Sequence, residues 1–136
     1  MDNCIFCRIA NKELPAQIVY EDGGTVAFLD IHPVNPGHVL VVPKEHAATI
    51  LDISPHSLTG VMDTVQRIAP AVLAGVGASG FNIGVNTGSV AGQAVMHFHL
   101  HLMPRFEGDG YELWHGPETS TDEIEAVAQK IREQIG

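Results

Sequence analysis

The sequence predicts an α+β fold, in which a mainly antiparallel five-stranded sheet packs with one longer central helix and a C-terminal helix. Two observations predict this class. Segments with the period of a β-strand come as a run of three and then a pair, rather than alternating one by one with helices. Two segments with helical periodicity follow the third and the fifth strand. The 136 residues, 45% of them hydrophobic, are expected to form a single domain over residues 1–136.

The first third of the chain is expected to hold a short helix and three strands. Residues 4–11 favour a helical turn. Strands are expected over residues 18–21 and 25–30, because the turn signal Asp22-Gly23-Gly24 separates them. Residues 38–43 are rich in β-branched side chains, which is typical of a buried strand.

The central helix has a clear start signal. Ser54 is a favourable N-cap and Pro55 occupies the first helical position. Apolar residues recur at helical spacing up to about residue 74. Pro70 lies inside this span and is expected to kink or split the helix, because proline removes a backbone donor.

Two further strands and a last helix complete the chain. The strand over residues 80–86 alternates Phe81, Ile83 and Val85 onto one face, and the last strand ends at Pro104. Ser120 and Glu123 form a capping box, which predicts a helix of about fifteen residues. Its inward face is expected to consist of Ile124, Val127, Ala128 and Ile131.

The last strand carries the most informative pattern in the sequence. Residues 96–103 are Met-His-Phe-His-Leu-His-Leu-Met, so three histidines alternate with apolar residues. In a strand this period of two places His97, His99 and His101 on one face, with the apolar residues, Met96 among them, facing the core. Histidine binds metals and can act as a nucleophile. The spacing alone leaves both functions open.

Charge and composition exclude several classes of partner. The formal net charge is -9, with seven lysines and arginines, which argues against nucleic acid and against an anionic membrane surface. A small phosphorylated ligand is not excluded, because a few local donors can hold it. No apolar run reaches the length of a membrane helix and no signal peptide is recognisable. A soluble cytoplasmic protein is expected.

Both cysteines lie in the sequence Cys4-Ile5-Phe6-Cys7. In a cytosolic chain this spacing indicates a metal half-site, a redox pair or two plain thiols. A redox pair would follow a strand, and no strand precedes Cys4. Half of a tetrahedral zinc site fits better, and it needs two more ligands.

Several ordered motifs resemble the histidine triad (HIT) family of nucleotide hydrolases and transferases, specifically its Hint-like branch. The family signature, in which histidines alternate with apolar residues, fits residues 96–103 at every position. Residues 28–33, 36–38 and 41–46 resemble the nucleotide-binding half of the family, and residues 86–88 with 92–93 resemble its phosphate loop. The resemblance covers nearly the whole chain.

The resemblance implies that His99 attacks the α-phosphorus of a nucleotide and forms a phosphoryl-histidine intermediate. A neutral imidazole is a competent nucleophile at pH 7. His101 and His38 would flank the transferring phosphate and stabilise its charge or pass a proton to the leaving group. Asn86 and Gln93 would hold phosphate oxygens.

The resemblance also implies a purine nucleoside site and a zinc site, while the edge of the small sheet separately suggests a homodimer. Asp30 corresponds to the acid that binds the ribose hydroxyls, while Phe28 and Ile31 would bracket the purine. Some microbial members bind a structural zinc, and the matching positions here are Cys4, Cys7, His46 and His97. No catalytic metal is required by the nucleophile mechanism. Dimerisation is expected to cover an edge of the small sheet.

One departure from the family bears on the substrate. Ala94 stands where many nucleoside phosphoramidases of the family carry a serine that is associated with protonating the leaving group. The expected activity is hydrolysis or transfer of a nucleoside 5′-monophosphoryl group from a purine nucleoside phosphoramidate or a related AMP conjugate. Residues 108–117 are a candidate for reaching the site of a partner subunit.

Three alternatives remain open at this point. A dinucleoside polyphosphate hydrolase shares the triad and differs in the leaving group. A nucleotide-binding regulatory protein would keep the fold with little turnover, although the intact His99 favours an enzyme. A metalloenzyme would use the triad itself as its metal site, and EDTA would abolish its activity.

Overall fold

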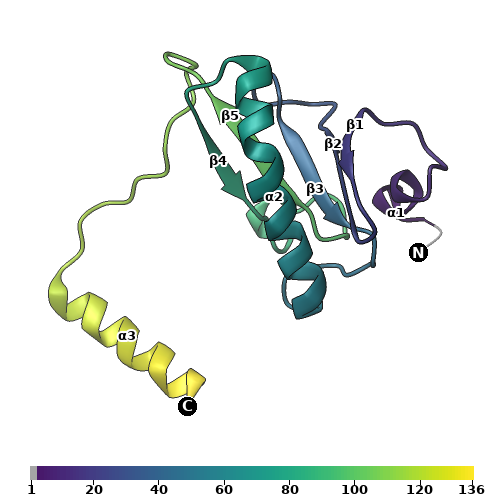
Figure 1. Ribbon diagram of the computed structural model, residues 1–136. Coiled ribbons are helices and arrows are strands. Elements are labelled where there is room, and N and C mark those ends of the chain that lie inside the picture. Colours follow the sequence, from purple (N-terminus) through teal and green to yellow (C-terminus); the bar gives the residue numbers. More distant parts are fainter. Residues whose placement is uncertain (1–2) are drawn as a thin grey trace.

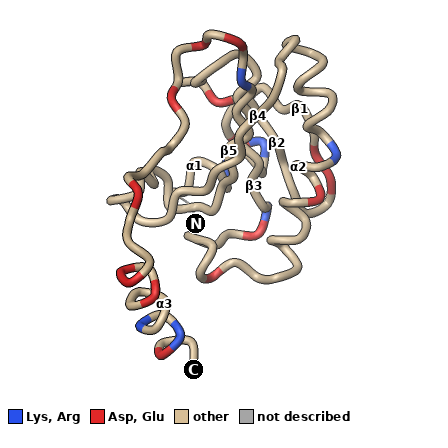
Figure 2. Tube along the Cα trace, turned by 90° about the vertical axis from the view of Figure 1, so that its left-hand side faces the viewer, with Lys and Arg blue, Asp and Glu red and all other residues tan. Residues whose placement is uncertain are grey.

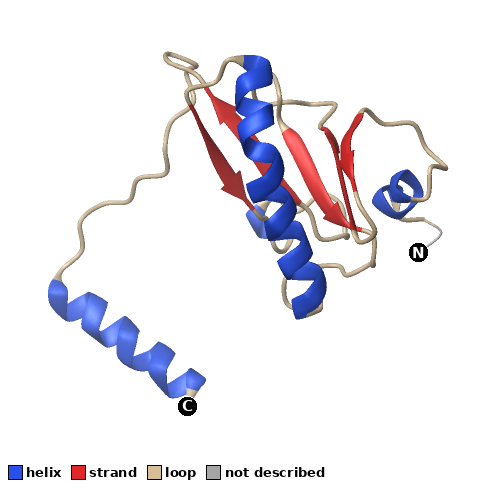
Figure 3. Ribbon diagram, viewed as in Figure 1, coloured by secondary structure: helices blue, strands red, loops and turns tan. Residues whose placement is uncertain are grey.

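The computed structural model describes residues 3–136. Its five strands form one antiparallel sheet in the order β1-β2-β3-β5-β4 (Figures 1 and 3). This architecture confirms the predicted fold class. In chain order the elements are α1 (Ile5–Ala10), β1 (Ile18–Glu21), β2 (Thr25–Leu29), β3 (Val39–Pro43), α2 (Pro55–Val76), β4 (Gly80–Gly84), the 3-10 turn η1 (Ser89–Ala91), β5 (Leu100–Arg105) and α3 (Thr121–Ile135).

Helix α2 covers one face of the sheet (Figure 1). In the register between β3 and β5, Val39 lies opposite Leu102 and Val41 opposite Leu100, so all four side chains point to the same face. They pack with a set of buried residues from α2: Val61, Val65, Ile68 and Ala69. Burying each of the valine, leucine and isoleucine side chains in this layer is worth roughly 1.5–3 kcal/mol, which holds β3 and β5 rigidly in place.

The opposite face of the sheet carries α1 and the histidine His101. Leu40 lies opposite His101 and therefore shares its face. A second apolar cluster forms there from α1 and the first three strands: Phe6, Ile9, Ala10, Val26, Phe28, Leu40 and Val42. His101 thus lies on the same face as an apolar wall rather than in open solvent.

Helix α2 is one uninterrupted element from Pro55 to Val76, so of the two expected effects of Pro70, a kink or a split, the split does not occur. The Ser54 side chain accepts a hydrogen bond from the N–H of Ser57, as predicted for the N-cap. The helix ends where Gly77 adopts the left-handed conformation with a φ of 71°. No helix among residues 3–136 is long and apolar enough to cross a membrane.

The histidine-rich strand is shorter than expected, because β5 begins at Leu100 rather than at Met96. The Phe98 N–H donates to the carbonyl of Ala47, 2.6 Å away, so this stretch bonds to the loop after β3 instead of the ladder. Phe98 is buried, as expected, but Met96 is 50% exposed and does not face the core. Strict alternation therefore holds only within β5.

Two apolar surfaces are open, and one of them, on α3, was expected to face inward. Helix α3 forms where predicted, but its apolar face is not buried by the described residues, since Ile124, Val127 and Ile131 are each more than half exposed. Acidic side chains are distributed along α3 (Figure 2). Strand β4 ends at Gly84, and Phe81 and Ile83 remain 40% and 45% exposed because β4 is an edge strand.

Candidate active site

Two cysteines and two histidines from distant parts of the chain meet beside α1. The Sγ atoms of Cys4 and Cys7 and the Nδ1 atoms of His46 and His97 all lie within 4.8 Å of one another. The Nδ1 of His97 is 3.3 Å from Cys4 Sγ and 3.1 Å from His46 Nδ1. The structure thus brings together the four residues for which the sequence indicated a zinc site.

The donor set fits a tetrahedral cation. The Nε2–H of His97 donates to the carbonyl oxygen of Pro43 over 2.8 Å, which leaves the Nδ1 lone pair facing the cluster. The N–H of Cys7 points at Cys4 Sγ, 3.4 Å away. Burial and the neighbouring Cys4 sulfur raise the pKa of Cys7 to about 11. A cation is therefore needed to hold the Cys7 sulfur as a thiolate at neutral pH.

The tautomer of His99 is fixed by the residue two positions before it. His99 is 8% exposed, and its Nδ1 lies 2.7 Å from the carbonyl oxygen of His97. A carbonyl can only accept a hydrogen bond, so Nδ1 carries the proton and Nε2 keeps a free lone pair. The Phe6 ring packs edge-on against the imidazole with centroids 5.0 Å apart. His99 thus presents an unprotonated ring nitrogen from a rigid, largely dry position.

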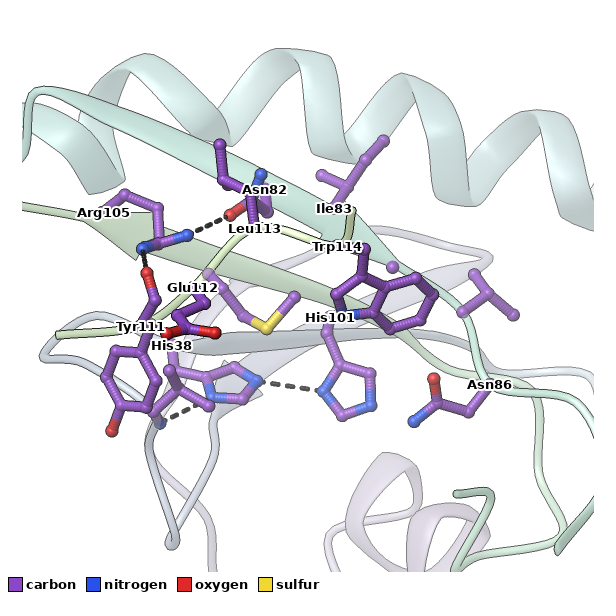
Figure 4. Close-up of a pocket in the computed structure, with 14 residues that line it drawn as sticks. His38, Asn82, Ile83, Asn86, His101, Arg105, Tyr111, Glu112, Leu113 and Trp114 are labelled. Carbon is purple, nitrogen blue, oxygen red and sulfur yellow. Dashed lines mark hydrogen bonds between the residues drawn. The ribbon is translucent and has the colours of Figure 1, made fainter. Parts of the chain in front are cut away.

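His38 and His101 form a hydrogen-bonded pair across β3 and β5. The peptide N–H of Val34 donates to His38 Nδ1 over 3.0 Å, so the proton of the His38 ring is on Nε2. That Nε2–H donates to His101 Nδ1, 2.9 Å away (Figure 4). The proton of His101 is therefore on Nε2, a buried atom with no hydrogen-bond partner among the described residues. Such an orphaned donor indicates a position for a ligand acceptor.

Both rings of this pair are held neutral. Burial lowers the pKa of His38, which the nearby Asp30 carboxylate only partly offsets. Burial and the adjacent His99 and His38 rings lower the pKa of His101 to about 4. At pH 7 the pair therefore carries no positive charge in the free protein, in agreement with its hydrogen-bond pattern.

The three histidines of the triad do not converge on one point. His97 faces the cysteines, whereas His101 faces His38 on the opposite side of His99. The rings of His99 and His101 lie in contact with centroids 5.0 Å apart. A single metal held by all three histidines therefore does not fit this arrangement.

Of the residues expected to bind a nucleoside, Phe28 lies beside α1 and Asp30 lies beside His38. Phe28 is buried and meets the ring of Phe6 edge-on, with centroids 5.5 Å apart. Asp30 Oδ1 accepts from the N–H of His32, and its Oδ2 lies 3.6 Å from His38 Nε2. Ile31 is 86% exposed, so its side chain is free to contact a ligand and is not part of the core.

Asn86 and Gln93 occupy different environments. The Asn86 side chain lines a cavity beside His101 (Figure 4). Gln93 is only 5% exposed: its Oε1 accepts from the N–H of Gly88, and its Nε2 donates to the carbonyls of Ala48 and Val95. The polar atoms of Gln93 are thus used to hold the loop in shape.

The cavity beside His38 and His101 has a volume of about 690 Å³. Its walls come from β4, β5 and the segment after Gly110 (Figure 4). Residues Tyr111 to Trp114, which the sequence suggested for a partner subunit, line this cavity in their own chain. Arg105 is in the wall, but its guanidinium is bound in two places by the Asp109 carboxylate.

Sequence analysis missed the residues that hold this wall. Asp109 is buried between two glycines with positive φ, and it also accepts from the N–H groups of Phe106 and Tyr111. Asn35 donates to both Asp109 and the carbonyl of Pro104, which ties the loop before His38 to the end of β5. The Gly-Asp-Gly sequence was the available signal, because it favours a tight turn around an inward carboxylate.

Comparisons with known proteins agree with this geometry. Residues 11–108 match the HIT domain family. The chain is 43% identical over 129 residues to the "Uncharacterized HIT-like protein MJ0866" of Methanocaldococcus jannaschii, covering 95% of this chain and 98% of the relative. It is 35% identical over 136 residues to the "Adenosine 5'-monophosphoramidase hnt1" of Schizosaccharomyces pombe, covering 98% of each. The "Adenylylsulfatase HINT3" of Arabidopsis thaliana is 36% identical over 108 residues, covering 79% of this chain and 55% of the relative.

Solved structures give the same result. SMU.412c from Streptococcus mutans superposes with a TM-score of 0.93 at 34% identity, covering 100% of this chain and 87% of that one. A "ZN-bound histidine triad family protein" from Mycobacterium smegmatis superposes with a TM-score of 0.78 at 37% identity, covering 97% of this chain and 98% of that one. By motif, fold and sequence identity, this chain belongs to the histidine triad (HIT) family.

Proposed function

We propose that this chain is a nucleotide hydrolase that transfers a nucleoside 5′-monophosphoryl group from AMP conjugates to water through a covalent intermediate on His99. The observation that carries the proposal is the hydrogen bond from His99 Nδ1 to the His97 carbonyl, because it leaves Nε2 free to attack. The names of the relatives hnt1 and HINT3 support AMP conjugates as the substrate class. The finer choice among phosphoramidates, sulfates and other conjugates is part of the proposal.

The chemistry takes two displacements. In the first, His99 Nε2 forms a bond to the α-phosphorus while the bond from phosphorus to the leaving group breaks. His101 Nε2–H donates to a phosphoryl oxygen and stabilises the charge that develops there. In the second, a water oxygen bonds to phosphorus, the bond to His99 breaks, and AMP is released with one proton going to solvent.

In this proposal the nucleoside extends between Asp30, beside His38, and Phe28, beside α1. Asp30 accepts hydrogen bonds from the ribose hydroxyls, since its Oδ2 has no hydrogen-bond donor among residues 3–136. Phe28 and Ile31 contact a purine. Asn86 donates to a phosphoryl oxygen, while Gln93 acts by holding the loop that carries the neighbouring peptide groups. A carboxylate at Asp30 selects a nucleoside over a bare phosphate group.

We propose that the cluster of Cys4, Cys7, His46 and His97 binds a structural zinc ion. A Cys₂His₂ set closes the coordination sphere, so such an ion supplies cross-linking rather than chemistry. It would join α1, the loop after β3 and the segment before β5. Two free cysteines that bind a metal, rather than form a disulfide, are consistent with the reducing cytoplasm expected from the sequence.

We also propose that the protein is a homodimer formed through the edge of β4. This strand contains no charged residue, and Phe81 and Ile83 are exposed on it. The opposite edge, β1, is protected because Glu21 pairs with Lys12 and Lys44. An open, uncharged and partly apolar edge is suited to pairing with a second copy.

The nucleophile is tested with the 4-nitrophenyl ester of AMP, whose leaving group needs no proton. His99→Ala is expected to lower kcat/KM at least about 10³-fold, because loss of the attacking nitrogen removes the covalent route. His56→Ala, at an exposed histidine outside the site, serves as the control and keeps wild-type turnover. Intact-mass analysis of quenched wild type should show a nucleotide adduct on His99. A His99→Ala variant of undiminished activity contradicts the proposal.

Zinc binding is tested by metal analysis of chain purified without chelators. We expect about one zinc per chain in wild type, much less in Cys7→Ser, and the wild-type amount in His56→Asn. Loss of the ion should destabilise Cys7→Ser by more than about 2 kcal/mol in chemical unfolding, because loss of a structural metal is among the large single-residue effects. Wild type that is fully folded and free of zinc, cobalt and iron would overturn the assignment.

The dimer interface is tested by light scattering at micromolar concentration. Wild type is expected to have the mass of two chains. Ile83→Glu places a charge on the open edge of β4 and should give the mass of one chain. The matched control is Val19→Glu on β1, where the native side chain is similarly exposed at 51%, and this variant should remain dimeric. A monomeric wild type, or dissociation by the control alone, contradicts the proposed interface.

A further inference from the structure

The hydrogen-bond chain through His38 and His101 begins at a peptide N–H. Val34 N–H donates to His38 Nδ1, His38 Nε2–H donates to His101 Nδ1, and His101 Nε2–H points to the ligand position. Every donor and acceptor in this series of hydrogen bonds is thereby assigned. The peptide proton of Val34 cannot be given up at any accessible pH.

Because this series of hydrogen bonds begins at a peptide N–H, it cannot deliver a proton to a substrate. If His101 gave its Nε2 proton to a leaving group, it would have to take the His38 proton at Nδ1 to stay neutral. His38 would then be an imidazolate, because its Nδ1 faces the Val34 N–H and cannot be protonated. Among residues 3–136 the acid beside this ring is Asp30, whose Oδ2 lies 3.6 Å from His38 Nε2, and a carboxylate there accepts a proton rather than supplying one.

A cationic form of the pair is opposed by the same geometry. A proton added to His101 Nδ1 would meet the His38 Nε2–H at a nitrogen separation of 2.9 Å. A proton added to His38 Nδ1 would meet the Val34 N–H at 3.0 Å. Burial acts in the same direction, because it lowers the pKa of both rings.

From these contacts we propose that His101 is a fixed hydrogen-bond donor and not a general acid, so that the enzyme selects AMP conjugates by the basicity of the leaving group. The substrates favoured are mixed anhydrides of AMP with carboxylic, sulfuric or phosphoric acids. Conjugates of alkyl amines are disfavoured. The inference rests on the proposed function, and it names the class of conjugate that this site cleaves.

The bond changes explain the selection. When His99 Nε2 bonds to phosphorus, the phosphorus–oxygen bond of an anhydride breaks and the leaving oxygen keeps the electron pair. The carboxylate, sulfate or phosphate formed is stable as an anion and needs no proton. An alkyl amine would leave as a strongly basic amide anion unless a proton reached its nitrogen first, and the pair of His38 and His101 does not supply one.

Substituted phenyl esters of AMP test this directly, because 4-nitrophenyl and 4-methoxyphenyl leaving groups have similar size and different basicity. In the absence of a general acid, kcat/KM should fall by roughly a hundredfold or more from the nitro to the methoxy ester. Values within about threefold, together with a solvent deuterium isotope effect of two or more, would overturn the inference. No turnover of either ester would instead count against the proposed function itself.

Two variants of His38 provide a second measurement. His38→Gln keeps an N–H that can donate to His101 Nδ1 but has no titratable proton, whereas His38→Leu removes the donor. If the pair only orients His101, His38→Gln should retain activity within about tenfold of wild type with the same dependence on the leaving group, and His38→Leu should lose at least about a hundredfold. If both variants keep the wild-type melting temperature and His38→Gln is no more active than His38→Leu, proton transfer through His38 is indicated and the inference is wrong.

Discussion

The hydrogen bond from His99 Nδ1–H to the carbonyl oxygen of His97 is the interaction on which the rest of the site depends. It determines which ring nitrogen of His99 is free, and it connects the nucleophile to the cluster of two cysteines and two histidines. The peptide that accepts this bond belongs to the residue whose side chain completes the Cys₂His₂ cluster. Helix α1 and the loop after β3 are therefore connected to His99 through His97, and Phe6 of α1 also packs directly against the His99 ring. A structural metal in this cluster would stiffen the nucleophile without touching the substrate.

The remaining parts of the site show the same use of the backbone to fix side-chain protons. Pro43 accepts from His97, and Val34 donates to His38, which in turn orients His101. Peptide groups thus fix the tautomers of His97, His99 and His38 directly, and that of His101 through His38. The sheet supplies the rigidity that this requires, because β3 and β5 are held by the buried layer under α2. The result is a preorganised arrangement of one lone pair and one N–H around the phosphorus position.

Much of the fold and the chemistry could be predicted from residue periodicity and motifs. The strands β1 and β3, the start of α2 and the capping box of α3 were predicted within a residue or two, because local turn and cap chemistry determines them. The four residues of the metal cluster were named from a resemblance, and the structure brings their donor atoms together. Three features were not predictable from local pattern. The late start of β5 depends on the bond between Phe98 and Ala47. The open face of α3 depends on the position of that helix, which adds no residue to either apolar cluster. The tautomer of His101 depends on the Val34 peptide.

The tautomer of His99 is the most direct test of this account, because the nucleophilic role depends on it. Long-range ¹H–¹⁵N correlation spectra of ¹⁵N-histidine-labelled protein at pH 7 distinguish a protonated ring nitrogen from an unprotonated one. The account predicts that His99 carries its proton on Nδ1 and leaves Nε2 unprotonated, while His38 and His101 both carry theirs on Nε2. A spectrum in which His99 Nε2 is protonated in the free protein would contradict it.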